Sequence, residues 1–337
     1  MLATFEGQTA RAAETSSERT EVSEHAALYQ IADGPYAVKS VEKLVLRDNK
    51  QGKELQLKIT YPDGKGKFPV IIWSHGAYGS KDSYEPLIRH WAGYGYVCIQ
   101  ANHSDSRSLG VRFGDRAAFK DWKSRPRDVS FVIDSLDEIA SEVQGLAEKM
   151  DRAAIGVGGH SYGAHTAQLV AGVTTTSGRR GERESHTDKR PQAFLLISPQ
   201  GTGEMLDRNS WRELTRPAMV ITGSMDNSKR TNKSYTWRME PFDYAPPGNK
   251  YLLFIQGADH SFGGITGRTS GLRLGSTNVD HVDYVKSASV AFWDAYLKHN
   301  EKAMGYLHSS QLFEATGGKA KITSVSPALD RENRYLW

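Results

Sequence analysis

Short apolar segments alternate with amphipathic ones along the chain from about residue 41 onward. Residues 41–47 and 54–62 alternate apolar and polar side chains with a period of two, which is typical of half-buried strands. Further segments are continuously apolar and short, which is typical of strands buried on both faces. These segments are residues 68–74, 95–102, 153–159, 193–198, 217–223 and 250–257.

Apolar residues at helical spacing lie between these segments and predict helices. The predicted helices are residues 83–94, 125–143, 162–172, 205–214 and 282–299. Buried strands that alternate with helices are typical of a mostly parallel central sheet with helices on both faces. We therefore predict a single α/β domain over residues 31–305, with a polar, flexible segment at residues 1–30 and a tail at residues 306–337. Residues 174–190 are predicted to be a solvated loop, with a lip over the site as the alternative.

Composition narrows the classes of function. The net charge is +4 over 337 residues, and the basic residues are spread along the chain, so we predict no nucleic-acid partner. The single cysteine, Cys98, excludes an internal disulfide and lies in an apolar segment that predicts a buried thiol. No apolar run reaches the roughly 18–20 residues of a membrane span. Residues 1–25 show no secretory signal, which favours the cytoplasm; an exported form with its signal removed is the alternative.

Residues 159–163, G-H-S-Y-G, place Ser161 between a predicted buried strand and a predicted helix. A serine in such a G-x-S-x-G turn is typical of a nucleophile elbow, in which a strained turn exposes the hydroxyl. We expect that a Cβ at Gly159 or Gly163 would clash with neighbouring backbone. The alternative is a glycine-rich structural turn. Because a free serine hydroxyl is a poor nucleophile, the chemistry needs a base and an acid elsewhere in the chain.

Asp226 and His260 follow the last two predicted buried strands, in the order serine, acid, histidine that this architecture requires. His260 is predicted to take the proton from Ser161, and Asp226 to hold the imidazole in the correct tautomer. Asp243 and Asp259 are the competing acids. We expect the side chain of Asp259 to point away from the histidine, because the two residues are neighbours in sequence.

The segment S-H-G-A-Y, residues 74–78, follows a predicted strand in the position of an oxyanion loop. The backbone N–H groups of Ala77 and Tyr162 are the predicted donors to the oxyanion. Tyr78, His165 and Trp237 are predicted to contact the substrate, with structural roles as the alternative for the last two. The histidines lack zinc-motif spacing and no phosphate-binding glycine motif is present, so we predict neither a metal nor a cofactor.

The sequences SHGAYGS, GHSYGAH, TGSMD and GADHSFGG, in this order, resemble the motifs of the α/β-hydrolase superfamily over about residues 40–300. The closer resemblance is to bacterial dienelactone-hydrolase-like proteins and platelet-activating factor acetylhydrolases. It implies the α/β-hydrolase fold, a triad of Ser161, Asp226 and His260, and an oxyanion hole formed by Ala77 and Tyr162. Dienelactone hydrolase has a cysteine nucleophile where this chain has Ser161, so the resemblance favours simple ester hydrolysis.

These observations predict a serine carboxylic-ester hydrolase that forms an acyl-enzyme on small-molecule or polymer-linked esters with short acyl groups. One alternative is a specialised esterase for acetylated sugars, for a short sn-2 acyl chain of a phospholipid, or for a polyester. A second alternative is a catalytically inactive binding protein on the same fold. The sequence predicts neither the physiological ester nor the oligomeric state.

Overall fold

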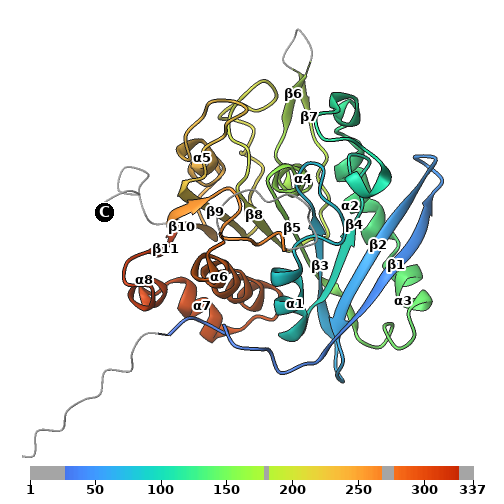
Figure 1. Ribbon diagram of the computed structural model, residues 1–337, viewed down its shortest axis with the longest axis horizontal. Helices are drawn as coiled ribbons and strands as arrows, with labels where there is room; N and C mark the ends of the chain where they lie inside the picture. Colours follow the sequence, from blue (N-terminus) through green and yellow to red (C-terminus); the bar gives the residue numbers. More distant parts are fainter. Residues whose placement is uncertain (1–26, 178–181, 268–276, 326–337) are drawn as a thin grey trace, which may run out of the picture.

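The computed structural model describes residues 27–177, 182–267 and 277–325. Within these ranges a nine-stranded sheet forms the centre of the molecule (Figure 1). In spatial order its strands are β1 (Val38–Asp48), β2 (Lys53–Pro62), β4 (Val97–Ala101), β3 (Phe68–Ser74), β5 (Met150–His160), β8 (Ala193–Ile197), β9 (Ala218–Met225), β10 (Lys250–Asp259) and β11 (Ala320–Val325). The β1–β2, β2–β4 and β10–β11 pairs are antiparallel, and the pairs between β4 and β10 are parallel. The predicted mostly parallel sheet is confirmed.

Helices cover both faces of the sheet, as predicted (Figure 1). One face packs against α2 (Ser124–Asp134), α3 (Leu136–Glu142), α4 (Tyr162–Ala171) and α5 (Thr236–Tyr244). The other face packs against α1 (Glu85–Gly93), α6 (Val279–Leu297), α7 (Glu301–Leu307) and α8 (Gln311–Ala315). None of the helices in the described ranges is long and apolar enough to cross a membrane.

Strand β3 shows why the central segments are continuously apolar. Val70 and Ile72 belong to the buried cluster on one face, while Ile71 and Trp73 belong to the cluster on the other. Successive side chains of a strand point to opposite faces, so a strand covered by helices on both sides needs an apolar residue at every position. Each such side chain stabilises the fold by roughly 1.5–3 kcal/mol. Cys98 on β4 is a buried free thiol, as predicted, and burial raises its pKa.

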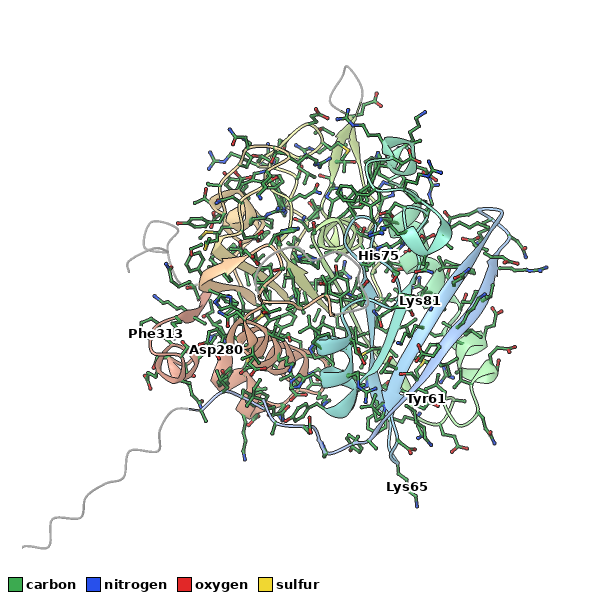
Figure 2. All side chains as sticks on the ribbon, in the orientation of Figure 1. Tyr61, Lys65, His75, Lys81, Asp280 and Phe313 are labelled. Carbon is green, nitrogen blue, oxygen red and sulfur yellow. The ribbon has the colours of Figure 1, made fainter. Side chains whose placement is uncertain are left out.

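The register of β3, β5, β8, β9 and β10 aligns their carboxyl ends at one edge of the sheet. The residues that follow these strands directly are His75, Ser161, Ser198, Asp226 and His260. His75, for example, lies in the interior just beyond β3 (Figure 2). Open α/β sheets bind their ligands at this edge, so the fold alone brings polar side chains from five strands to a candidate site.

The predicted helix at residues 205–214 is wrong, because this segment consists of turns. Asp207 accepts a hydrogen bond from the Asn209 N–H at 2.8 Å, and the Asp207 N–H donates to Ser210 Oγ at 3.0 Å. Such local side-chain bonds give the backbone an alternative to the helical ladder. Leu206, Trp211 and Leu214 of this segment are nevertheless buried.

Other differences are smaller. The predicted helix at residues 125–143 is interrupted at Ser135, which separates α2 from α3. Residues 174–190 contain a short antiparallel pair, β6 (Thr175–Ser177) and β7 (Glu182–Glu184). Residues 103–124 include two 3₁₀ turns, η1 (Arg107–Leu109) and η2 (Arg116–Phe119).

Regular structure also continues beyond residue 305, where the sequence pattern predicted only a tail. Helices α7 and α8 are followed by β11, which pairs with β10 and forms an edge of the sheet. β11 escaped prediction because most of its residues are only half-buried, so it carries no apolar run. At the other end, residues 1–26 of the predicted flexible segment lie outside the described ranges. Tyr29 Oη donates a hydrogen bond to Asp294 of α6 at 2.9 Å.

Candidate active site

Ser161 occupies a strained turn between β5 and α4. Its backbone angles, φ 56° and ψ −116°, lie in a region that residues other than glycine rarely adopt, at a cost of about 1–3 kcal/mol. The Ser161 N–H donates to the Ile197 carbonyl at 2.8 Å, and the Ser161 carbonyl accepts from the His165 N–H at 3.1 Å. The strand on one side and the helix on the other therefore hold the turn in its strained form.

Gly159 and Gly163 permit this turn through close backbone contacts. A Cβ on Gly163 would lie 1.9 Å from the Ser74 carbonyl oxygen, and a Cβ on Gly159 would lie 2.3 Å from the Gly163 carbonyl. Both distances are far inside van der Waals contact, so the expected clash is confirmed. Without side chains at these positions, α4 packs directly against the end of β3, and Ser161 lies beside the loop that begins at His75.

We predict that Gly163→Ala lowers the free energy of unfolding by about 3 kcal/mol, because the backbone at Ser74 must move to make room. The matched control is Gly305→Ala in α7, where a Cβ would have no heavy atom within 4 Å. This control should gain up to about 1 kcal/mol from helix propensity. Urea unfolding of the two variants measures the difference, and equal stabilities would contradict the packing argument.

Ser161, His260 and Asp226, the three residues predicted to carry the chemistry, form a continuous chain of contacts. His260 Nε2 lies 3.0 Å from Ser161 Oγ, and His260 Nδ1 lies 2.8 Å from Asp226 Oδ1. An ionised carboxylate only accepts hydrogen bonds, so Nδ1 carries the ring proton and donates it to Asp226. The lone pair of Nε2 is then directed at the Ser161 hydroxyl. Asp226 also accepts hydrogen bonds from Ser198 Oγ and Thr222 Oγ1, both at 3.0 Å.

Arg238 helps His260 to keep Asp226 ionised. Its Nε lies 3.6 Å from Asp226 Oδ1, and its Nη1 donates to the carbonyls of Ser198 and Pro199 at 3.1 Å each. Burial raises the pKa of Asp226, but the hydrogen bond from His260 and the charge of Arg238 together outweigh it and hold the pKa below its ordinary value. Asp226 is therefore an anion at neutral pH, as a partner for an imidazolium must be.

The competing acid Asp259 has local partners. Its Oδ1 accepts hydrogen bonds from the Ser261 N–H at 2.9 Å and from Ser261 Oγ at 2.7 Å. The carboxylate thus closes the turn that follows β10. Of these two aspartates it is Asp226 that bonds the ring of His260, whose Nδ1 also lies 2.8 Å from Ser198 Oγ. Asp243, the other competing acid, lies on α5.

His160 supports the site from beneath. Its Nε2 donates to the His260 carbonyl at 2.9 Å, and its Nδ1 accepts from Tyr84 Oη at 3.0 Å. Tyr84 Oη in turn accepts from the Gly76 N–H at 2.9 Å. Burial, with the nearby His260, lowers the pKa of His160 to about 3, so this ring stays neutral. Two neutral side chains, His160 and Tyr84, therefore link the backbone of His260 to the loop after β3.

In the loop at residues 75–79, some backbone N–H groups donate hydrogen bonds and one is left without a partner among the described residues. The Gly76 N–H donates to Tyr84 Oη, the Tyr78 N–H donates to Asp105 Oδ2 at 3.0 Å, and the Gly79 N–H donates to the Gly76 carbonyl at 3.0 Å. The N–H of Ala77 has no partner among the residues that the structure describes. The N–H of Tyr162, the first residue of α4, also has no partner among the described residues. The first amides of a helix have no partner within the helix itself. These two groups are the predicted oxyanion donors.

An aromatic cluster continues from Tyr162. Its rings are Tyr78, Phe113, Phe119, Tyr162 and His165. Neighbouring rings have centroids 5.0–6.0 Å apart, and Phe113 is 71% exposed. Two of the three residues predicted to bind substrate, Tyr78 and His165, thus join one cluster beside Ser161. The two phenylalanines escaped prediction because residues 103–124 carry no periodic apolar pattern.

Trp237, the third predicted substrate contact, lies on α5 and is largely buried. Its Nε1 donates to the Thr202 carbonyl at 2.7 Å, and the Arg238 guanidinium lies 4.9 Å from its ring. These contacts favour the structural alternative, in which the indole packs against the arginine that faces Asp226.

His165 is 2% exposed, and neither ring nitrogen has a hydrogen-bond partner within the described part of the chain. Burial, together with the charges of Arg125 and Arg230, lowers the pKa of His165 to about 4. The folded protein therefore keeps this ring neutral at pH values where the unfolded chain, with a histidine pKa near 6.5, would bind a proton. Above pH 6.5 both states are neutral. Below it, proton binding favours the unfolded state until the pH approaches 4.

We predict that this single imidazole costs the protein about 1.4 kcal/mol of stability between pH 7.5 and pH 5.5. The variant His165→Phe removes the titrating group, so it should lose about 1.4 kcal/mol less than the wild type over the same interval. Urea unfolding of both proteins at the two pH values measures this difference and cancels the effect of the substitution on packing. Equal losses in the two proteins would contradict the prediction.

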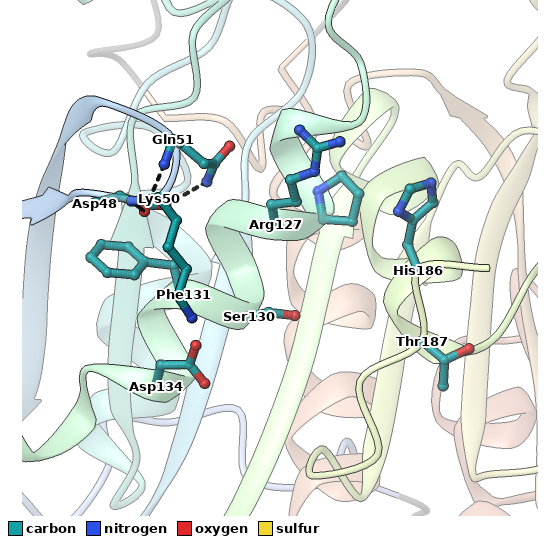
Figure 3. A pocket seen from close by; sticks show the side chains of 10 residues that line it. Asp48, Lys50, Gln51, Arg127, Ser130, Phe131, Asp134, His186 and Thr187 are labelled. Atoms are coloured by element: carbon teal, nitrogen blue, oxygen red, sulfur yellow. Dashed lines mark hydrogen bonds between the residues drawn. The ribbon is translucent and has the colours of Figure 1, made fainter. Parts of the chain in front are cut away.

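A surface pocket of about 300 Å³ lies away from these residues, between the β1–β2 turn, α2 and the segment after β7 (Figure 3). It is lined by Asp48, Lys50, Gln51, Pro126, Arg127, Ser130, Phe131, Asp134, His186 and Thr187. Gln51 Nε2 donates to Asp48 Oδ2 at 2.6 Å and closes one side of the pocket (Figure 3). None of the residues predicted from the sequence lines it. Among the described residues, no group of three or more histidine, cysteine, aspartate or glutamate side chains is arranged to hold a metal ion.

A known family and a known protein resemble parts of this chain. The family model described as Chlorophyllase, an α/β-hydrolase-type esterase family, matches residues 26–177, which include β1 to β5, the loop after β3 and Ser161. A putative phospholipase A2 of Schizosaccharomyces pombe (strain 972 / ATCC 24843) is 36% identical over 52 residues. That alignment covers 15% of this chain and 12% of the yeast protein.

The chain has the α/β-hydrolase fold, and the two likenesses support an ester hydrolase in general. Neither likeness identifies a branch of the superfamily, so the closer resemblance to dienelactone-hydrolase-like proteins and platelet-activating factor acetylhydrolases stays a prediction.

Proposed function

We propose that the protein is a serine carboxylic-ester hydrolase that works through an acyl-enzyme, with Ser161 as nucleophile, His260 as general base and acid, and Asp226 as its anionic partner. The observation that carries the proposal is the unbroken sequence of contacts from Ser161 Oγ to His260 Nε2 at 3.0 Å and from His260 Nδ1 to Asp226 Oδ1 at 2.8 Å. The strained backbone of Ser161 at the edge of the sheet supports it, because this conformation is expected where function requires an exposed hydroxyl.

In the proposed acylation step, Ser161 Oγ attacks the ester carbonyl carbon while His260 Nε2 takes the hydroxyl proton. The carbonyl oxygen becomes an oxyanion that accepts hydrogen bonds from the N–H groups of Ala77 and Tyr162. Each such donor is worth about 3 kcal/mol in the transition state. Collapse of the intermediate breaks the bond to the alcohol oxygen, which receives the proton from His260. The alcohol leaves, and the acyl group remains on Ser161.

Deacylation repeats these steps with water as the nucleophile. The water oxygen attacks the acyl carbon while His260 Nε2 takes a proton from the water. The N–H groups of Ala77 and Tyr162 bind the second oxyanion. Collapse breaks the bond to Ser161 Oγ, which recovers its proton from His260, and the carboxylic acid leaves. Asp226 stabilises the imidazolium in both halves of the reaction and stays ionised throughout, in agreement with its lowered pKa.

The aromatic cluster around Tyr162 supports an ester whose acyl or alcohol part is apolar, because its rings offer apolar surface next to the nucleophile. We propose esters with short acyl groups as substrates. The likeness to a putative phospholipase A2 supports a phospholipid as one of the candidates, with the short sn-2 acyl chain that the sequence already predicted as an alternative.

A panel of p-nitrophenyl esters from acetate to long acyl chains tests the proposal, together with phospholipids that differ only in the sn-2 acyl chain. We expect an initial burst of p-nitrophenol that approaches one equivalent per enzyme, and turnover that falls sharply beyond propionate. A folded protein that hydrolyses none of these esters would contradict the proposal and favour an inactive binding protein on the same fold.

A further inference from the structure

Arg125 is a buried cation that the proposed mechanism does not use. It lies in the first turn of α2 and is 2% exposed. Its Nε donates to Asp105 Oδ1 at 2.9 Å and its Nη2 to Asp105 Oδ2 at 2.8 Å, so the two side chains form a forked ion pair. Asp105 is 1% exposed. Burial raises the pKa of Asp105, but the charge of Arg125 and its hydrogen bonds lower it by more. The carboxylate therefore stays charged. A buried charge is costly unless it is paired and hydrogen-bonded, so such a pair requires an explanation.

The pair holds the loop at residues 75–79 on both sides of Ala77. On one side, Arg125 Nη1 donates to the His75 carbonyl at 2.7 Å. On the other side, Asp105 Oδ2 accepts from the Tyr78 N–H at 3.0 Å. The peptide that carries the Ala77 N–H is therefore fixed at both ends, while the amide itself is left for another partner.

His75 strengthens the same loop and lies beside the same cation. Its Nε2 accepts from the His103 N–H at 3.1 Å, so the ring proton is on Nδ1, which donates to the Gly76 carbonyl at 2.7 Å. Burial, together with the charges of Arg125 and His103, holds the pKa of His75 well below its usual range. Because Nδ1 is a donor, its approach to Arg125 Nη2 at 3.3 Å is a contact between two donors and forms no hydrogen bond. The imidazole and the guanidinium each donate instead to carbonyls of the loop, His75 to that of Gly76 and Arg125 to that of His75.

Arg125 also supports the second donor. The guanidinium carbon lies 4.4 Å from the centre of the Tyr162 ring, which is within the range of a cation–π interaction. The Tyr162 N–H is the first amide of α4. The Arg125 side chain thus contacts Tyr162, which carries one oxyanion donor, and also fixes the loop that carries the other donor, the Ala77 N–H.

We propose that the buried Arg125–Asp105 pair positions both backbone donors of the oxyanion site. The inference rests on the proposed function above. Arg125 is a positioning residue, since it acts through the loop and through Tyr162 and touches no reacting atom. Its effect should therefore appear in the transition state, where the oxyanion exists, and should leave the affinity for the neutral ester nearly unchanged.

The test compares Arg125→Met and Arg125→Lys with a matched control, Arg216→Met. Arg216 is also an arginine above an aromatic ring, 4.7 Å from the centre of Phe194, and it donates to the carbonyls of Val170 and Ala171 at the other end of α4. Removing it should reduce stability without moving either oxyanion donor. The lysine variant keeps the charge beside Asp105 and guards against a methionine variant that fails to fold.

Three quantities are measured for each protein: kcat per active site titrated by the burst, KM for p-nitrophenyl acetate, and the affinity for a phenylboronic acid, which forms an anionic tetrahedral adduct. For Arg125→Met we expect kcat per titrated site to fall about 100-fold, with a similar loss of boronate affinity and a KM within a few-fold of the wild type. Arg125→Lys should lose at least about 10-fold in kcat by the same argument, since one ammonium cannot replace the fork. Arg216→Met should keep the wild-type kcat per titrated site.

A purely structural role would lower the melting temperature and the number of titrated sites, but would leave kcat per site and boronate affinity unchanged. That result in both Arg125 variants, or a change confined to KM, would overturn the inference while the wild-type burst upholds the proposed function. A wild-type protein that hydrolyses none of the esters would overturn the proposed function and this inference with it.

Discussion

The Ser161→Ala variant is expected to hydrolyse p-nitrophenyl acetate with a kcat about 10⁶-fold below that of the wild type. The substitution removes the only atom of the residue that can attack the ester, while the contact between His260 and Asp226 remains in place. Residual hydrolysis above the rate in water should persist, because the amides of Ala77 and Tyr162 can still bind an oxyanion. Initial rates of the purified variant measure the loss.

The control for this experiment is Ser141→Ala on α3. Ser141 is exposed, and its Oγ donates to the Glu138 carbonyl at 2.8 Å, away from the sheet edge. This variant should keep the wild-type rate. A Ser161→Ala protein that also keeps it would exclude Ser161 as the nucleophile.

The second large effect is expected for Asp226→Asn, with kcat reduced about 10⁴-fold. The carboxylate is fully buried and is bonded by His260, Ser198 and Thr222. An amide at this position carries no charge to stabilise the imidazolium, and its NH₂ group favours the tautomer of His260 in which Nε2 holds the proton and cannot act as base. Steady-state kinetics with the same ester measure the effect.

Asp259→Asn is the matched control, because Asp259 competes with Asp226 as the predicted acid that pairs with His260. Among the described residues, the Asp259 carboxylate accepts hydrogen bonds only from Ser261. The asparagine side chain of the variant should therefore leave kcat nearly unchanged. The reverse outcome, a large loss for Asp259→Asn and a small one for Asp226→Asn, would assign the acid to Asp259.

The central strands and the candidate site could be predicted from the sequence because they depend on short-range patterns. A continuously apolar run such as residues 68–74 predicts a strand buried on both faces, and parallel strands place their following residues at one edge. Ser161, Asp226 and His260 each follow such a run within three residues, so their meeting required only the order of the strands.

Arg125, Asp105 and Arg238 could not be found in this way. Asp105 lies in a segment without periodic pattern, and Arg125 has the sequence context of a solvated first helical turn, yet both are buried. Arg238 lies on α5, which contains Pro241 and was not predicted as a helix. Their roles depend on contacts between distant segments, such as Arg125 with the His75 carbonyl, and a single sequence does not encode these contacts as a local pattern.

The predicted helix at residues 205–214 shows the opposite error. Its apolar residues have helical spacing and most of them are buried, but Asp207 and Ser210 bond the backbone locally and favour successive turns. Burial and helical spacing together were therefore insufficient, because the side chains of Asp207 and Ser210 compete with the helical ladder.

The central claim, that Ser161 becomes acylated, is tested most directly by mass spectrometry of the acyl-enzyme. The wild-type protein is mixed with p-nitrophenyl acetate, quenched in acid within milliseconds and digested. The account predicts the mass of one acetyl group on the peptide that contains Ser161, and no such mass in the Ser161→Ala variant. Acetylation of a different residue during the burst, or a full burst that leaves Ser161 unmodified at every quench time, would contradict it.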